Sequence, residues 1–242
     1  MREAGASSGI EMLARLRTKG RTALDEAAAK QVLAAYGIAV PRSVVVTPLG
    51  DPAPALGDLA SPYALKVMAP GILHKSDVGG VRLRLMDAAA VREARDAMLA
   101  LPAIASQAPD GFLVEEMMPP GHELVVGGTV DSRFGPVVML GLGGIFVEIF
   151  GDVAFRLCPV RPHEARDMLD ELRSLPVLRG VRGGMVADEN AILEVLLRVG
   201  GEGGLMMELA GAIRELDINP LIASTSRAVA ADARILLAGD AA

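Results

Sequence analysis

The chain has 242 residues, which is enough for one large domain or two small ones that each bury a hydrophobic core. Hydrophobic residues make up 51% of the chain and aromatic residues only 3%, so the core must be built from aliphatic side chains and methionine. The formal net charge of -6 provides no positive field for polyanions, and we therefore expect no nucleic-acid partner.

The chain also shows the composition of a protein that works away from membranes. Its single cysteine, Cys158, can form no internal disulfide, which favours a reducing compartment. No apolar run approaches the roughly 20 residues that span a bilayer, and the first residues lack the apolar segment of a signal peptide. We expect a cytoplasmic protein with no membrane partner.

The first quarter of the chain predicts one helix and one strand. Residues 1–20 predict a loose N-terminal segment. Residues 24–37 predict a helix that Asp25 caps and Gly37 ends, and a strand follows at 43–47. The prolines between positions 48 and 62 leave room for no more than a short helix.

The stretch from Leu65 to Leu85 predicts a strand, a polar loop and a second strand. Glycines let backbone amides approach an anion, and a lysine supplies a point charge for phosphate. Imidazole is the one side chain that serves as a neutral nucleophile or base near pH 7 without a large pKa shift. The stretch therefore predicts a phosphate-handling site with five candidate residues, Lys66, His74, Lys75, Gly79 and Gly80.

Two of these candidates have plain structural alternatives. Lys66 has apolar neighbours, so its ammonium must either extend to solvent or meet an anion. The polar loop after Lys66, with His74, Gly79 and Gly80, favours contact of the ammonium with an anion. His74 lies among polar residues, where a histidine is more often merely solvated than catalytic. The other two histidines, His122 and His163, fit exposed polar roles.

The rest of the chain predicts more strands than helices. Helices are expected at 87–101, 162–174 and 188–199, with a loop at 179–184. Strands are expected at 111–117, 123–130, 136–140, 145–150, 154–158, 212–218 and 228–236, with a glycine-rich break at 141–144. Because strands run without an intervening helix from 111 to 158, the pattern favours an α+β fold with a largely antiparallel sheet.

Acidic and amide side chains mark two further candidate sites. Glu115, Glu116 and Glu123 flank a turn between strands, where carboxylates can accept hydrogen bonds from a ribose while the connecting backbone meets an adenine edge. Solvated hairpin charges are the alternative. Asn219 and Asp232 end or line two apolar strands and supply the oxygen ligands that Mg²⁺ prefers, although capping of turns is the commoner role of such residues.

These segments together resemble a known family. The chain is similar, over about residues 23–236, to the ATP-grasp subunit or domain of nucleoside-diphosphate-forming acyl-CoA synthetases. This group contains ADP-forming acetyl-CoA synthetase and, more distantly, the β subunit of succinyl-CoA synthetase. The most specific segments are LKVMAPGILHKSDVGGVRL, FGPVVMLGLGGIFVE, and ELDINPLIA with VAADARI.

The resemblance implies an ATP-grasp fold with two α+β lobes, at residues 21–114 and 115–238, that enclose ATP or ADP with Mg²⁺. It implies phosphorylation of His74, contact of the nucleotide phosphates with Lys66 and Arg156, and Mg²⁺ ligation by Asn219 and Asp232. It also implies that the hinge segment from Glu115 to Met117 lies near adenine and that Glu123 binds ribose. The proline-rich segment at 47–61 departs from relatives, which usually carry a helix there.

The implied reaction is a phosphate relay from an acyl phosphate through histidines to ADP, or its reverse. An α-type partner subunit is expected to bind CoA and the organic acid, because neither binding domain is visible in this sequence. The alternative is a non-catalytic ATP-binding regulatory module of an acyltransferase-type or other multidomain assembly.

Overall fold

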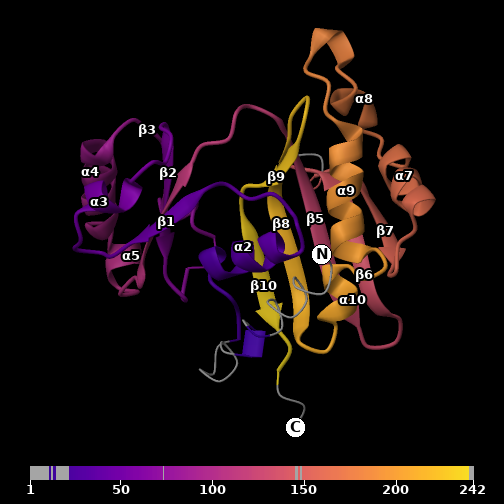
Figure 1. Ribbon diagram of the computed structural model, residues 1–242, viewed down its shortest axis with the longest axis horizontal. Helices are drawn as coiled ribbons and strands as arrows, with labels where there is room; N and C mark the ends of the chain where they lie inside the picture. The colour runs from indigo at the N-terminus through magenta and orange to yellow at the C-terminus, as the bar shows by residue number, and fades with distance from the viewer. Residues whose placement is uncertain are drawn as a thin grey trace. The chain divides into compact units, whose positions relative to one another are not determined.

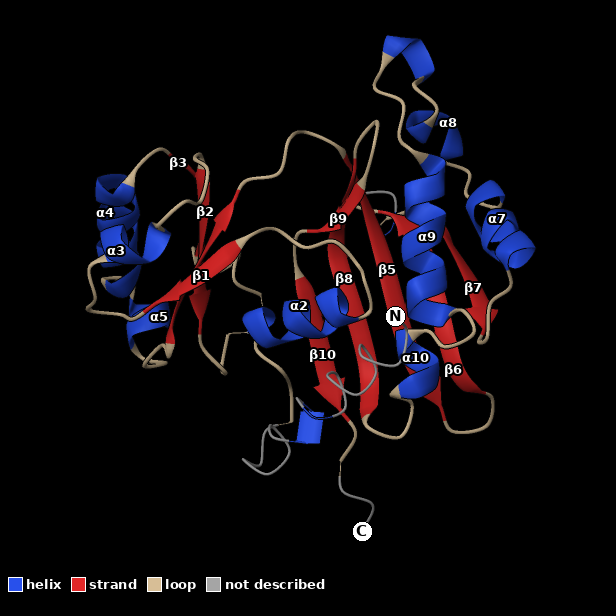
Figure 2. Cartoon of the chain, in the orientation of Figure 1, coloured by secondary structure: helices blue, strands red, loops and turns tan. Residues whose placement is uncertain are grey.

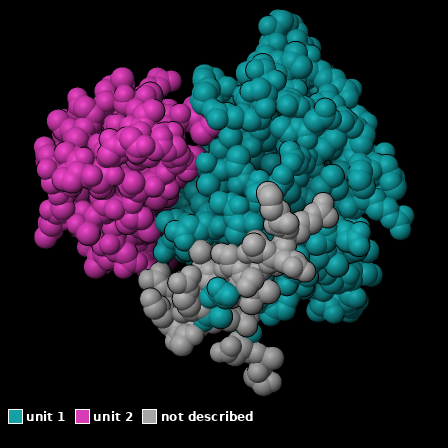
Figure 3. Space-filling model, viewed as in Figure 1, with its two compact units in different colours: residues 1–40, 119–242 teal, residues 41–118 magenta. Residues whose placement is uncertain are grey.

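The computed structural model shows a chain with two compact units, one formed by residues 41–118 and the other by residues 1–40 with 119–242 (Figures 1 and 3). Each unit has its own hydrophobic core. The structure describes residues 11, 13–14, 22–72, 74–144, 147 and 149–239. The segment 1–20, which the sequence predicts to be loose, lies almost wholly outside the described residues.

The smaller unit, residues 41–118, is an antiparallel sheet with helices packed against it (Figure 2). Its strand order is β1-β4-β2-β3, so β2, which carries Lys66, lies inside the sheet. The sheet contains β1 (Ser43–Val46), β2 (Tyr63–Met68), β3 (Val81–Leu85) and β4 (Gly111–Glu116). The helices are α3 (Pro52–Leu56), α4 (Ala88–Leu99) and α5 (Pro102–Ala105).

The larger unit is built around a six-stranded antiparallel sheet in the order β10-β8-β5-β6-β7, with β9 paired to β8. Helices α9 and α10 pack on β5 and β6, while α2 packs on β10 (Figure 1). The strands are β5 (His122–Asp131), β6 (Gly135–Leu142), β7 (Val153–Leu157), β8 (Ile213–Ala223), β9 (Ala228–Ala230) and β10 (Ala233–Leu237). The helices are α2 (Glu26–Ala35), α7 (Pro162–Asp170), α8 (Leu175–Leu178), η1 (Val181–Gly183), α9 (Glu189–Gly200) and α10 (Leu205–Glu208).

The predicted α+β class and the predicted helix starts are confirmed. The carboxylate of Asp25 accepts a hydrogen bond from Ala28 N, and Asp87 and Asp188 cap α4 and α9 in the same way. Gly37 follows α2 with a φ of 75°, the left-handed conformation that favours glycine at a helix end. The proline-rich segment forms only the short helix α3, as expected.

Several predicted elements differ from the structure. Strand β6 continues through Leu142 into the break expected at 141–144, and β8 continues to Ala223, beyond the strand expected at 212–218. Among the described residues of the strand expected at 145–150, Val147 is helical and Ile149 and Phe150 lie in a turn; positions 145, 146 and 148 lie outside the described residues. The strand expected at 228–236 is split into β9 and β10 by a turn. The helix expected at 162–174 ends at Asp170, because the chain turns there into the separate helix α8.

The compact units divide the chain differently from the two lobes expected from the sequence. Residues 22–40 pack with the C-terminal part, since Leu24 N donates to Ile235 O at 2.9 Å and Leu237 N donates to Thr22 O at 2.9 Å. Compact units are defined by contacts within the chain and not by how the chain encloses a nucleotide, so the expected lobe boundaries stay a prediction. Within the described ranges, no helix combines the length and the hydropathy that a membrane-spanning segment needs.

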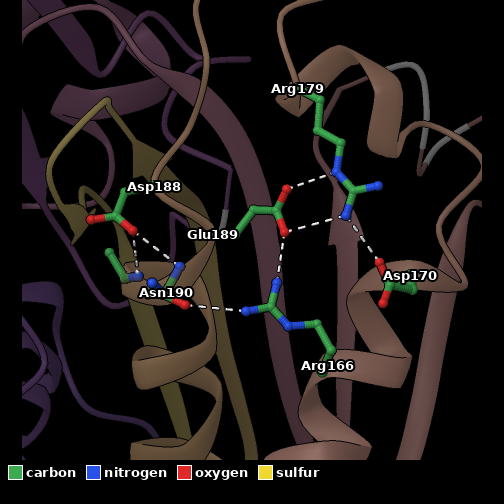
Figure 4. Close-up of polar contacts among 7 residues, drawn as sticks. Arg166, Asp170, Arg179, Asp188, Glu189 and Asn190 are labelled. Carbon is green, nitrogen blue, oxygen red and sulfur yellow. Dashed lines mark hydrogen bonds and ion pairs between the residues drawn. The ribbon is translucent and has the colours of Figure 1, made fainter.

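A network of ion pairs fixes the segment between α7 and α9 (Figure 4). The carboxylate of Glu189 accepts from Arg166 Nη1 at 2.6 Å and from Arg179 Nε at 2.8 Å. Arg179 also donates to Asp170 at 3.1 Å. The hydrogen bond from Arg179 holds the pKa of Glu189 below its ordinary value.

This network predicts a pH-dependent contribution to stability. Because the pKa of Glu189 is lower in the folded chain, its stabilisation is present above the unfolded pKa and is lost as the pH falls through the folded pKa. We expect Glu189→Gln to lower the free energy of unfolding by about 0.5–1 kcal/mol at pH 7, a range that allows for solvent screening. Urea unfolding at pH 7 and at acid pH measures the difference, which should vanish in acid. The matched variant Glu202→Gln removes the charge of an exposed glutamate outside the network and should leave the free energy of unfolding at pH 7 unchanged.

Candidate functional site

His74 is exposed in the loop that joins β2 to β3. Gly79 in that loop has a φ of 71°, and a Cβ on Gly80 would lie 2.6 Å from Val67 Cγ1. The loop shape therefore requires both glycines. Their amides donate within the loop, Gly79 N to Ser76 O at 3.1 Å and Gly80 N to Lys75 O at 2.7 Å. The predicted contact of these amides with phosphate stays a prediction. A phosphate bound there would compete with the two hydrogen bonds that the amides donate within the loop.

Lys66 is buried in β2 and forms an ion pair with Glu115 in the neighbouring strand β4. The Nζ of Lys66 lies 3.0 Å from Glu115 Oε2, and the two side chains are 10% and 2% exposed. The register of the two strands pairs Ala64 with Glu115. The lysine therefore does not extend its charge into bulk solvent. Both residues were predicted, but as contacts of different parts of a nucleotide rather than of each other.

Glu116 and Met117, the other two predicted hinge residues, form hydrogen bonds within the smaller unit. Glu116 Oε1 accepts a hydrogen bond from Ala60 N at 2.8 Å and another from Arg42 Nη1 at 3.1 Å. Met117 N donates to Pro62 O at 2.9 Å. These bonds fix the course of the chain as it leaves β4. Contact of this segment with adenine stays a prediction.

Glu123 is exposed near the start of β5, where the glycine-rich segment approaches it. Gly143 N donates to Glu123 O at 2.7 Å, and a Cβ on Gly143 would lie 3.0 Å from that same oxygen. The glycine is thus explained by a close approach of two backbones rather than by a phosphate. The carboxylate of Glu123 is accessible to a ligand, and its predicted role with ribose stays a prediction.

Asn219 and Asp232 are neighbours in the fold. Asn219 lies in β8 and Asp232 in the turn between β9 and β10, and Asn219 N donates to Asp232 O at 3.3 Å. Burial alternates along β8, so Asn219 and the half-buried Asp217 lie on the face opposite the buried Leu216 and Ile218.

The donor set around this turn fits magnesium. One amide and one carboxylate oxygen suit a hard cation that keeps waters and takes its other ligands from phosphate oxygens. Among the described residues, no group of three or more His, Cys, Asp or Glu side chains is placed to hold a metal ion by itself.

Arg156 is already engaged. It lies in β7, and its guanidinium donates to both carboxylate oxygens of Glu171, one of them at 3.1 Å. These hydrogen bonds raise the pKa of the guanidinium above its ordinary value. A role of Arg156 toward phosphate stays a prediction, because a phosphate would have to share the guanidinium with Glu171.

Two contacts near these residues were not indicated by the sequence. His122 is half-buried rather than exposed, and its Nε2 lies 2.7 Å from Met185 O. His163 is exposed, as expected. Lys30 of α2 is also buried and contacts the turn that carries Asp232. An i, i+4 pair of Glu26 and Lys30 on an apolar helix face was the available signal, but it is equally typical of a solvated surface.

Comparison with known proteins settles the family. The chain matches the ATP-grasp domain family over residues 15–237. It belongs to the ATP-grasp family. This ATP-grasp chain is 37% identical, over 95% of its length and 98% of the relative, to the β subunit of ADP-forming acetate–CoA ligase II of Pyrococcus furiosus.

Two solved structures of acetyl-coenzyme A synthetase 1 from Ca. Korarchaeum cryptofilum are also similar to this ATP-grasp chain. One, in complex with coenzyme A, Ca-AMPCP and HgCl+, has a TM-score of 0.86 and 34% identity over 94% of this chain and 99% of that one. The other contains coenzyme A and Mg-AMPPCP, with its phosphohistidine segment pointing towards the nucleotide binding site. It has a TM-score of 0.81 and 35% identity over 95% and 100% of the two chains.

The buried pair of Lys66 and Glu115 predicts a large, partner-dependent effect on stability. Lys66→Met leaves Glu115 as a buried carboxylate without its ammonium, so we expect the free energy of unfolding to fall by about 3 kcal/mol. The double variant Lys66→Met with Glu115→Leu removes both charges and should regain most of that loss. Urea unfolding of wild type, both single variants and the double variant measures the coupling. Purely additive losses would contradict a direct pair.

Proposed function

We propose that the chain is the nucleotide-binding, β-type subunit of an ADP-forming acyl-CoA synthetase that interconverts an organic acid such as acetate and its CoA thioester. In this enzyme His74 carries phosphate to and from the nucleotide. The likeness to a named β subunit over 95% of this chain and 98% of the relative supports the activity. The exposure of His74 on the loop after β2 supports its role, because a phosphate carrier must be reachable.

The chemical step is a nucleophilic displacement at phosphorus. An imidazole nitrogen of His74 attacks the γ-phosphorus of ATP, and an N–P bond forms as the bond to the oxygen bridging toward the β-phosphate breaks. ADP leaves with the electron pair of that bond. In the reverse direction, ADP attacks phosphohistidine and regenerates neutral imidazole. Because a phosphoramidate retains high transfer potential, the step can run either way.

We assign several side chains and backbone segments to the nucleotide. An ammonium has three N–H donors, so Lys66 can keep its contact with Glu115 while it donates to phosphate oxygens. Lys75, Gly79 and Gly80 are the further phosphate contacts, the backbone from Glu115 through Glu116 to Met117 borders adenine, and Glu123 binds ribose. Asn219 and Asp232 hold Mg²⁺, which neutralises phosphate charge when bound.

A partner subunit completes the proposed enzyme. The relative is a β subunit by name, and we propose that an α-type subunit supplies the sites for CoA and the organic acid and the histidine that exchanges phosphate with His74. The choice of acid then resides mainly in that partner. A single cysteine favours the cytoplasm as the compartment in which the two subunits meet.

Phosphorylation of the purified chain tests this function. Incubation with γ-labelled ATP and Mg²⁺ should give acid-labile, base-stable label, and His74→Ala should lower it at least a hundredfold while nucleotide binding persists. The matched control His163→Ala changes an exposed histidine and should retain full labelling. Label that survives in the His74 variant would contradict the role of His74. Nucleotide binding without labelling, even beside a cognate α subunit, would contradict the catalytic function and favour a regulatory module.

A further inference from the structure

Helix α2 is joined to the turn between β9 and β10 by a buried lysine. Lys30 Nζ donates to Ala231 O at 2.6 Å and lies 2.8 Å from Glu26 Oε1, one helical turn away. The side chains of Lys30 and Glu26 are 4% and 1% exposed. Lys30 therefore carries its charge into the interior of the larger unit and places it against one backbone carbonyl.

The carbonyl that Lys30 binds belongs to the residue before Asp232, the proposed ligand of Mg²⁺. The same residue is held from the other side, because Ala231 N donates to Pro220 O at 3.0 Å. Asp232 O in turn accepts from Asn219 N. Lys30 thus contributes to holding the peptide group between Ala231 and Asp232 in one orientation, next to both proposed metal ligands.

Stability alone is a weak reason for such a pair. Moving two charges out of water is costly, and replacing a buried ion pair by apolar residues of similar volume is often neutral or stabilising. A leucine at position 30 would fill the same space. It would not donate to the Ala231 carbonyl, and this directional contact is what distinguishes Lys30 from an apolar core residue.

We propose that Lys30 is a positioning residue that fixes Asp232 for the magnesium ion of the bound nucleotide, with Glu26 orienting its ammonium. This inference rests on the proposed function, which makes Asp232 a metal ligand. Residues that orient metal ligands from outside the coordination shell typically change metal affinity about 10- to 100-fold when they are substituted. The effect of Lys30 should therefore appear in metal binding.

The test measures binding of Mn²⁺, used as a probe for Mg²⁺, to the full chain with saturating ADP by electron paramagnetic resonance. We expect Lys30→Met to weaken Mn²⁺ binding about tenfold. In single-turnover phosphorylation of His74, the Mg²⁺ concentration for half-maximal rate should rise by a similar factor, while the rate at saturating Mg²⁺ stays near that of wild type. Should Lys30→Met fail to fold because Glu26 is left charged, the double variant Glu26→Gln with Lys30→Met takes its place.

A matched control separates positioning from general loosening of the helix. Val32→Ala shortens a fully buried side chain on α2, so it should lower the melting temperature without changing Mn²⁺ affinity. If the folded Lys30 variant binds Mn²⁺ like wild type, or if Val32→Ala weakens binding as much, the positioning role is overturned.

The variant Asp232→Ala distinguishes failure of this inference from failure of the proposed function. Weaker Mn²⁺ binding in Asp232→Ala with unchanged binding in the Lys30 variant would overturn only the role of Lys30. Unchanged binding in Asp232→Ala, or no Mn²⁺ binding with ADP in wild type, would overturn the proposed metal site and the inference with it.

Discussion

An ammonium group can be buried in a protein only where a carboxylate and hydrogen-bond acceptors surround it, and this constraint shapes both units of the chain. In the smaller unit Lys66 meets Glu115 across adjacent strands, and in the larger unit Lys30 meets Glu26 along one helix. Lys66 and Glu115 are themselves assigned to the nucleotide, and Lys30 contacts the residue before the proposed metal ligand Asp232. The two pairs therefore join the stability of each unit to the geometry that its proposed chemistry requires.

The features that the sequence predicted well are those set by neighbouring residues. Asp25 was predicted as a helix cap, and helices were expected to begin at Asp87 and Asp188, because a capping bond joins residues only two or three positions apart. The strand, loop and strand around His74 followed from an apolar run that gives way to polar residues and glycines. The order of strands after residue 111 also indicated an antiparallel sheet, since too few residues separate them for helical crossovers.

The features that the sequence did not predict depend on contacts between distant segments. The bond from Lys30 to Ala231 joins residues 201 positions apart, and no local pattern indicates it. The pair of Lys66 and Glu115 depends on the register of β2 against β4. The apolar residues at 149 and 150 looked like a strand, yet Ile149 and Phe150 are exposed in a turn, where hydrophobicity alone is a misleading signal.

The loop of His74 combines an exposed side chain with anchored ends. Ile72 N donates to Ala69 O on one side, and Gly79 and Gly80 donate to Ser76 and Lys75 on the other. A typical backbone hydrogen bond contributes about 1 kcal/mol net, so releasing these bonds would cost roughly 3 kcal/mol. A free-energy difference of that size keeps one resting position dominant and leaves the released loop as a minor population of about 1%. The phosphate exchange proposed for His74 requires an exposed imidazole on a loop that has one resting position and can be released from it.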